Sequence, residues 1–169
     1  MLSLVDNDLS EKMQEFNERL RLMQEIRQKP IKFMNDAHKN FYESNLKRLE
    51  DNGKSIDSYE KALFYTLGII LSDENRPQNL INLLYDFKDN CIIIDWEEDK
   101  YGWITGTDIR IIRLAFNLYN GGYPTAFNIE NQEKKLRETE LYSVSDIFAY
   151  LDPILREYAF EAIRIRFNS

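Results

Sequence analysis

The sequence is poor in the residues that cross-link or turn a polypeptide chain. Its 169 residues include one cysteine, six glycines and four prolines. The single thiol, Cys91, can form no internal disulfide and falls short of any zinc-site spacing. Because an all-β fold needs many turns, the scarcity of glycine and proline argues against one.

Long hydrophobic runs are also missing. The longest run, residues 62–71, is interrupted by Thr66 and Gly68 and is shorter than the ~20 residues that span a bilayer. The N-terminus lacks the basic start and long apolar stretch of a secretory signal peptide. We therefore expect a cytoplasmic protein without a membrane span.

Negative charge is present in excess and is unevenly distributed. The chain has a net charge of −7, and residues 56–130 hold six basic and twelve acidic side chains, a net of −6. An acidic field repels nucleic-acid phosphate and attracts basic protein surfaces. Direct nucleic-acid binding is therefore disfavoured, and a basic protein is the expected partner.

The first thirty residues read as a separate amphipathic helix. Asp8 and Glu11 have the spacing of a capping box, and Pro30 stops or kinks the helix. Between Asp8 and Pro30, apolar residues repeat at alternating spacings of four and three: Leu9, Met13, Phe16, Leu20 and Met23. Such a stripe can pack on the chain's own domain, form a homodimer seam or bind a partner. We predict a helix over 1–30 and a core domain over 31–169.

The remaining pattern predicts a mainly α fold, a compact bundle of about six to seven helices with at most a short strand near 91–94. The expected helices cover 35–49, 57–71, a stretch starting at Pro77, 108–120, a short segment ending near Leu151, and 153–167. The second of these is apolar nearly all round, which predicts the central buried helix. Gly68 within it permits the close approach of another backbone.

Side chains for covalent or acid–base catalysis are scarce. The only histidine, His38, is expected on a polar helix face, where a surface or structural role is the simpler interpretation. Cys91 opens an apolar run, which predicts a buried, inert thiol. We therefore expect no enzyme activity, no cofactor and no metal site.

An acidic cluster lies in the middle of the chain. Its members are Asp86, Asp89, Asp95, Glu97, Glu98 and Asp99. Carboxylates can hold Mg²⁺ or Ca²⁺, but EF-hand spacing is absent and adjacent charges usually form solvated surface. We predict that this cluster contacts a partner.

One stretch offers an alternative function. The loop from Gly102 to Thr107 precedes a helix that carries Arg110 and Arg113, and a helix N-terminus can receive an anion. The Trp103–Arg113 region could therefore belong to a small ligand- or nucleotide-binding domain or enzyme. In the simpler interpretation Trp103 anchors the loop, Thr107 or Asp108 caps the helix, and the arginines pair with carboxylates.

Four stretches of the chain resemble a family of short uncharacterised proteins from Firmicute bacteria and their phages. They are His38–Tyr42, Ala62–Ile69, Trp103–Gly121 (which contains LAFNLYNG) and Phe160–Phe167. Residues 1–30 and an excursion near 125–140 look like additions to the family core. The chain departs from the family pattern at Ile104 and Asp108, where the pattern has Gln and Ser, so a site built on those positions would be altered here.

The resemblance implies no activity, since none is assigned to the family, but it implies a setting in mobile genetic elements of bacteria. By analogy, small acidic proteins of that setting often bind a host protein, and some resemble inhibitors of bacterial immune systems such as CRISPR nucleases. We therefore expect an intracellular protein-binding protein that inhibits a host immune nuclease, such as a Cas nuclease, through its acidic surface. A homodimer formed through the N-terminal seam is a separate expectation.

Overall fold

The chain divides into two compact units. The structure, a computed structural model, describes residues 2–76, 79–93, 102, 104–121 and 143–168, and for residues 2–10 it describes the backbone alone. Apart from the last two residues, the first unit is Met1–Ile31 and the second is Lys32–Phe167. We describe each unit by itself.

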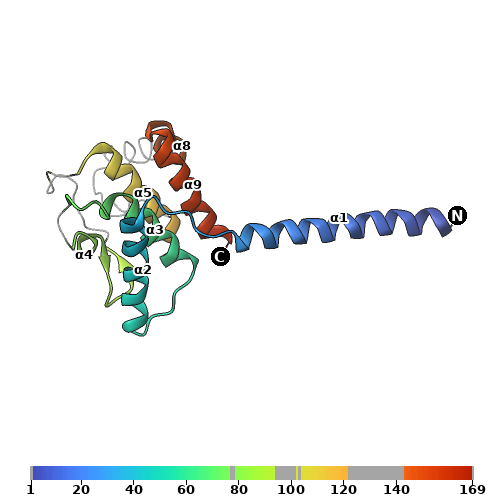
Figure 1. Cartoon of the computed structure of the whole chain (residues 1–169), viewed down its shortest axis with the longest axis horizontal. Coiled ribbons are helices and arrows are strands. Elements are labelled where there is room, and N and C mark those ends of the chain that lie inside the picture. The colour runs from blue at the N-terminus through green and yellow to red at the C-terminus, as the bar shows by residue number, and fades with distance from the viewer. Residues whose placement is uncertain (1, 77–78, 94–101, 103, 122–142, 169) are drawn as a thin grey trace, which may run out of the picture. The chain divides into compact units, whose positions relative to one another are not determined.

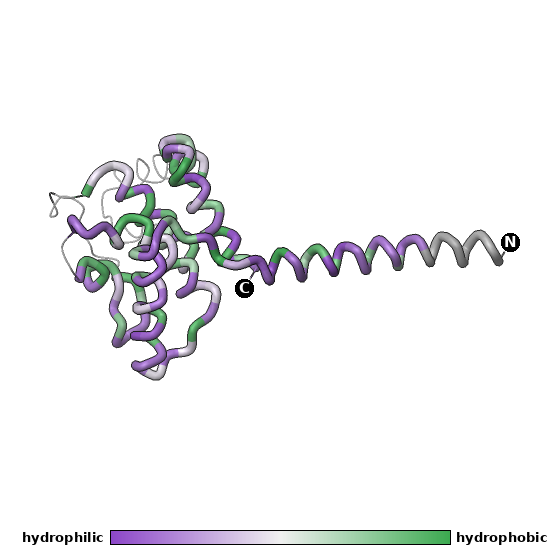
Figure 2. Tube along the Cα trace, in the orientation of Figure 1, coloured by the Kyte–Doolittle hydropathy of each residue, from purple (hydrophilic) through white to green (hydrophobic). Residues whose placement is uncertain are grey.

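The first unit is one uninterrupted helix, α1 (Leu2–Gln28). It begins six residues before the predicted cap at Asp8, which corrects that prediction: helical backbone continues through Asp8 because nothing in the preceding residues breaks it. It ends just before Pro30, as the sequence predicts. In the coloured part of this helix, hydrophobic residues recur among hydrophilic ones (Figure 2).

The second unit is built around α3 (Ser58–Leu71), in which eleven of fourteen residues are buried. The helix begins with a capping box. The Asp57 side chain accepts a hydrogen bond from the backbone N–H of Tyr59 at 2.6 Å, and the Glu60 side chain accepts one from the backbone N–H of Asp57 at 3.1 Å. Figure 1 shows α3 among the other helices of this unit. The predicted central helix is thus confirmed.

Helix α2 (Asp36–Asp51) packs on α3 through a stripe spaced four, three and four: His38, Tyr42, Asn45 and Leu49. The two helices approach closely at Gly68. A Cβ atom added to Gly68 would lie 2.6 Å from His38 Cδ2 and 3.0 Å from Phe41 Cδ1. Only glycine leaves room for the two rings. The sequence predicts the close approach of a backbone at Gly68, whereas the closest neighbours are these side chains.

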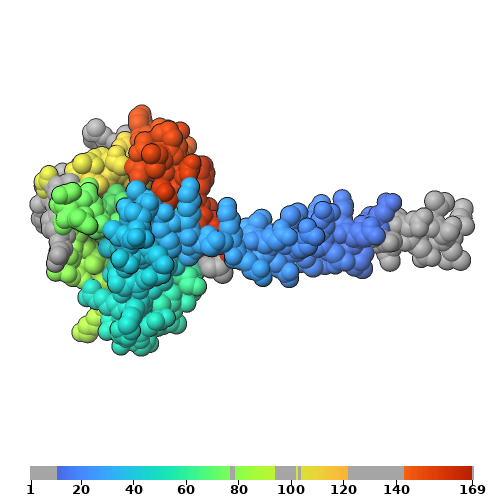
Figure 3. All heavy atoms as spheres, in the orientation of Figure 1, coloured from blue at the N-terminus to red at the C-terminus, as the bar shows by residue number. Residues whose placement is uncertain are grey.

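Helix α5 (Gly106–Asn120) packs on α3 and ends at Gly121, whose φ of 72° is the left-handed conformation of a C-cap. It is followed by α8 (Val144–Tyr150) and α9 (Pro153–Asn168). In Figure 3 these last helices, orange to red, lie beside α5, in yellow. Arg166 of α9 donates to the Leu118 carbonyl of α5 at 2.8 Å, which fixes one contact between the two.

Between α3 and α5 the chain forms the short helix α4 (Ile81–Leu84) and a hairpin of β1 (Tyr85–Asp86) and β2 (Cys91–Ile92). The helix that the sequence predicts from Pro77 onward begins instead at Ile81. The backbone becomes extended at Tyr85 because the rings of Tyr85 and Phe87 pack on the ring of Phe64. Their centroids lie 5.0 Å and 5.6 Å from that of Phe64.

Seven helices and a single two-stranded sheet occur in the described part of the chain, so the predicted mainly α fold with a short strand is confirmed. Within those same residues, no helix combines the length and the apolar character needed to cross a bilayer.

Candidate functional site

The apolar stripe of α1 is exposed to solvent. Met13, Phe16, Leu20 and Met23 are each 42–57% exposed, whereas large apolar side chains of the second unit are mostly buried. The predicted seam residue Leu9 lies in the helix, but its side chain is outside the described residues. A row of exposed apolar side chains on one helix face is the signature of a binding surface.

Between residues 11 and 28, all charges but that of Arg21 are segregated around this stripe. At about 100° per residue, the basic residues Lys12, Arg19 and Arg27 lie within roughly 80° of the midline of the stripe. The glutamates of the same segment lie roughly 120–180° away, on the opposite face: Glu11, Glu15, Glu18 and Glu25. The apolar positions alone do not reveal this pattern, although the heptad positions of the charged residues contain it.

One ion pair lies away from the stripe, between Arg21 Nε and Glu25 Oε1 at 3.2 Å. Both side chains are more than half exposed, and the pair spans i and i+4. Such a pair stabilises the helix slightly, and neither of its side chains lies on the stripe.

The structure describes two of the six residues in the predicted acidic cluster, Asp86 and Asp89. Asp86 has a structural role, because its carboxylate accepts from the backbone N–H groups of Asp89 and Lys88 in the hairpin turn, and these bonds hold the pKa of Asp86 below its usual value. Asp89 is exposed. The other four lie outside the described residues: Asp95, Glu97, Glu98 and Asp99.

A carboxylate side chain of the protein itself already occupies the start of α5. The N-cap is Thr105, rather than the predicted Thr107 or Asp108, because Asp108 at the third helical position completes a capping box. The Asp108 carboxylate accepts from the Thr105 N–H at 2.7 Å, from the Thr105 hydroxyl at 2.8 Å and from Arg76 Nη2 at 2.7 Å. A bound anion here would meet a buried negative charge.

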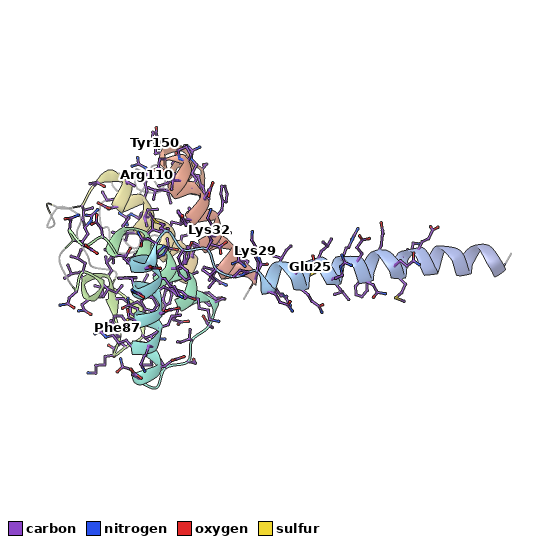
Figure 4. The ribbon with its side chains drawn as sticks, viewed as in Figure 1. Glu25, Lys29, Lys32, Phe87, Arg110 and Tyr150 are labelled. Atoms are coloured by element: carbon purple, nitrogen blue, oxygen red, sulfur yellow. The ribbon has the colours of Figure 1, made fainter. Side chains whose placement is uncertain are left out.

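The two arginines of α5 are used within the fold. Arg110 donates to the Gly106 carbonyl at 2.8 Å and lies over the ring of Tyr150 at 4.7 Å from its centroid (Figure 4). Arg113 is completely buried. Trp103 lies outside the described residues. This arrangement favours a structural role for Arg110 and Arg113 over ligand binding.

His38 is completely buried, which corrects its predicted place on a polar face. Its Nε2–H donates to the Tyr65 carbonyl at 2.8 Å, and its Nδ1 accepts from the Met34 N–H at 3.3 Å. Burial lowers the pKa of His38 below its usual 6.5. With both nitrogens bonded to backbone in the core, the imidazole is structural and has no free atom for catalysis.

Cys91 is exposed rather than buried as predicted. The register of β2 explains the difference: Ile92 takes the inward position and Cys91 the outward one. Partial burial of the thiol and, secondarily, Asp86 and Asp89 raise the pKa of Cys91. The thiol therefore stays protonated and unactivated at neutral pH. No group of metal-ligating side chains occurs among the described residues.

The chain belongs to a family of unknown function (DUF6075), whose profile matches residues 28–169. No curated protein and no solved structure matches it significantly. The family match agrees with the resemblance to an uncharacterised family, while the origin in Firmicute bacteria and their phages stays a prediction. The match begins at Gln28, the last residue of α1, so the apolar stripe lies outside the family region.

Proposed function

We propose that this member of the family is a small protein-binding protein that docks on its partner through the apolar stripe of α1. The observation that supports this function is the exposure of Met13, Phe16, Leu20 and Met23, each at 42–57%. Single helices gain most of their stability in proteins by packing an apolar face. A partner that covers the stripe would supply that packing.

The stripe alone makes a modest contribution to affinity. Full burial of a Leu, Met or Phe side chain is worth about 1.5–3 kcal/mol, and these are already about half covered, so four of them supply roughly 3–6 kcal/mol. Association costs about 4–15 kcal/mol in lost freedom. Docking therefore needs further contacts from the margins of the stripe or from the partner's own apolar face.

A pair of leucines tests the docking role with a matched control. Leu20 lies on the stripe and is 42% exposed, and Leu22 lies roughly 140° from its midline and is 48% exposed. We expect Leu20→Ser to abolish capture of the partner from a bacterial lysate by the full chain, and Leu22→Ser to leave capture unchanged. If both variants capture the same proteins as the parent, α1 does not dock through the stripe.

A second candidate function is inhibition of a host immune nuclease, such as a Cas nuclease, through the acidic middle of the chain. The net charge of −6 over residues 56–130 supports it, because acidic surfaces associate rapidly with basic channels. Reversing Asp95, Glu97, Glu98 and Asp99 to lysine should relieve inhibition of nuclease cleavage. Reversing the exposed Glu43 and Glu50 of α2 is the control and should not. Equal inhibition by both variants would exclude the acidic surface.

A further inference from the structure

The shape of the α1 stripe limits what can cover it. Met13, Phe16, Leu20 and Met23 occupy successive a and d positions of a heptad. They therefore form a narrow seam rather than the wide apolar face that packs on a domain core. A seam of this width accommodates one further helix.

The charges beside the seam distinguish between possible helices. Between residues 11 and 28, the charged residues at the a, d, e and g positions are Lys12, Arg19 and Arg27. None of these positions holds a carboxylate. Charges at these positions select coiled-coil partners, since opposite charges across the seam attract and like charges repel.

A second copy of this chain fits these charges poorly. In a parallel pair, the guanidinium of Arg27 faces Arg27 of the other copy, while Lys12 and Arg19 face the uncharged Asn17 and Gln24. In an antiparallel pair centred on Phe16 and Leu20, Arg19 faces Arg19. Neither arrangement places a carboxylate of residues 11–28 opposite these cations, so like charges oppose self-association.

We infer that the partner of α1 is a helix of another protein with an apolar seam flanked by carboxylates at its e and g positions. This inference rests on the proposed docking function and adds the class of partner. The carboxylates would face Lys12 and Arg19, both of which are exposed, and the ion pairs would set partner choice. The glutamates of α1 would point to solvent on the far face. The predicted homodimer is disfavoured for the same reason.

An anionic membrane is the other surface that attracts a basic, amphipathic helix, and it fits less well. Membrane-surface helices have a broad apolar face and a polar face rich in Lys and Arg. The segment 11–28 has four basic and four acidic side chains, so its net charge is zero, and its polar face carries the glutamates.

Two synthetic peptides test the inference on the full chain. Both are helices of about three heptads with leucine at a and d; one has glutamate at e and g, and the other has lysine. We expect titration calorimetry to show binding of the glutamate peptide at least about tenfold more tightly than the lysine peptide. The double variant Lys12→Glu/Arg19→Glu should invert this preference, and Arg21→Glu, on the outer face, should leave it unchanged.

Because two new glutamates can weaken the helix, Lys12→Gln/Arg19→Gln serves as a second variant, and circular dichroism checks the helix content of each. It should bind both peptides with similar affinity. Equal affinity of the parent chain for the two peptides would overturn the inference and leave docking through the stripe intact.

Binding to neither peptide would overturn the inference, and the leucine pair then decides whether docking itself survives. A sedimentation measurement that shows a dimer dependent on Leu20 and tighter than the peptide complex would overturn it in favour of self-association. Binding to phosphatidylglycerol vesicles but to neither peptide would overturn it in favour of a membrane.

Discussion

Helices α1 and α3 differ in where their apolar residues lie, although both carry several large ones. Phe64 of α3 is completely buried, whereas Phe16 of α1 is 57% exposed. The α3 side chains stabilise the fold of Lys32–Phe167, so removing one of them should lower the free energy of unfolding. The exposed α1 side chains are the ones that the proposed docking uses, so their removal should be a cost in binding.

The largest expected difference comes from removing one phenylalanine from each helix. Phe64→Ala should lower the free energy of unfolding by about 3–5 kcal/mol, because it leaves a cavity beside the rings of Tyr85 and Phe87. Phe16→Ala should change it by less than about 0.5 kcal/mol. Urea unfolding followed by near-ultraviolet circular dichroism measures both. Similar losses in the two variants would show that α1 is part of the cooperative core.

The next contrast concerns carboxylates. Asp108 is 2% exposed, completes the capping box of α5 and pairs with Arg76. Asp108→Ala should therefore cost about 2–4 kcal/mol by urea unfolding. Glu25→Ala breaks the exposed pair with Arg21 and should leave unfolding of the second unit unchanged. A small effect of Asp108→Ala would mean that the capping box is not needed to start α5.

Glycines give a smaller contrast within the second unit. Gly68→Ala should cost about 1–3 kcal/mol, because the new methyl group meets His38 and Phe41. Gly102→Ala is the control: a Cβ there has no neighbour within 4 Å, and thermal unfolding should be unchanged. If Gly68→Ala unfolds at the same temperature as the parent, the two helices can move apart without loss.

Strong periodic patterns made the helices predictable. The apolar run of α3, the alternating stripe of α1 and the end of α5 at Gly121 follow from local sequence. The fold class could therefore be predicted without the structure. The short α4 could not, because helical pattern continues past Leu84 and only the packing of Tyr85 on Phe64 turns the chain extended.

Burial of single polar residues was harder to predict. His38 has the charged neighbours Asp36 and Lys39, which suggest a polar face, but its spacing from Tyr42, Asn45 and Leu49 follows the buried stripe of α2. The sequence predicts the cap of α5 two or three residues late, because Thr105, Thr107 and Asp108 can all cap a helix. Only the carboxylate at the third helical position distinguishes them.

The smallest expected effect is a pH dependence that belongs to the second unit alone. Burial lowers the pKa of His38 in the folded chain, so below about pH 6.5 the unfolded chain binds a proton that the folded chain does not. The free energy of unfolding should therefore be highest above pH 6.5 and should decrease as the pH falls below it. The decrease should be no more than about 1.4 kcal/mol per pH unit.

His38 is the only histidine of the chain, so its ring signals in nuclear magnetic resonance report this titration directly. Urea unfolding between pH 7.5 and 5.5 should show the loss in the parent and a flatter profile in His38→Gln, although that variant starts less stable because two backbone hydrogen bonds change. The helicity of α1, which has no histidine, should stay constant over the same range. A ring pKa at or above 6.5 would contradict the burial that places His38 between α2 and α3.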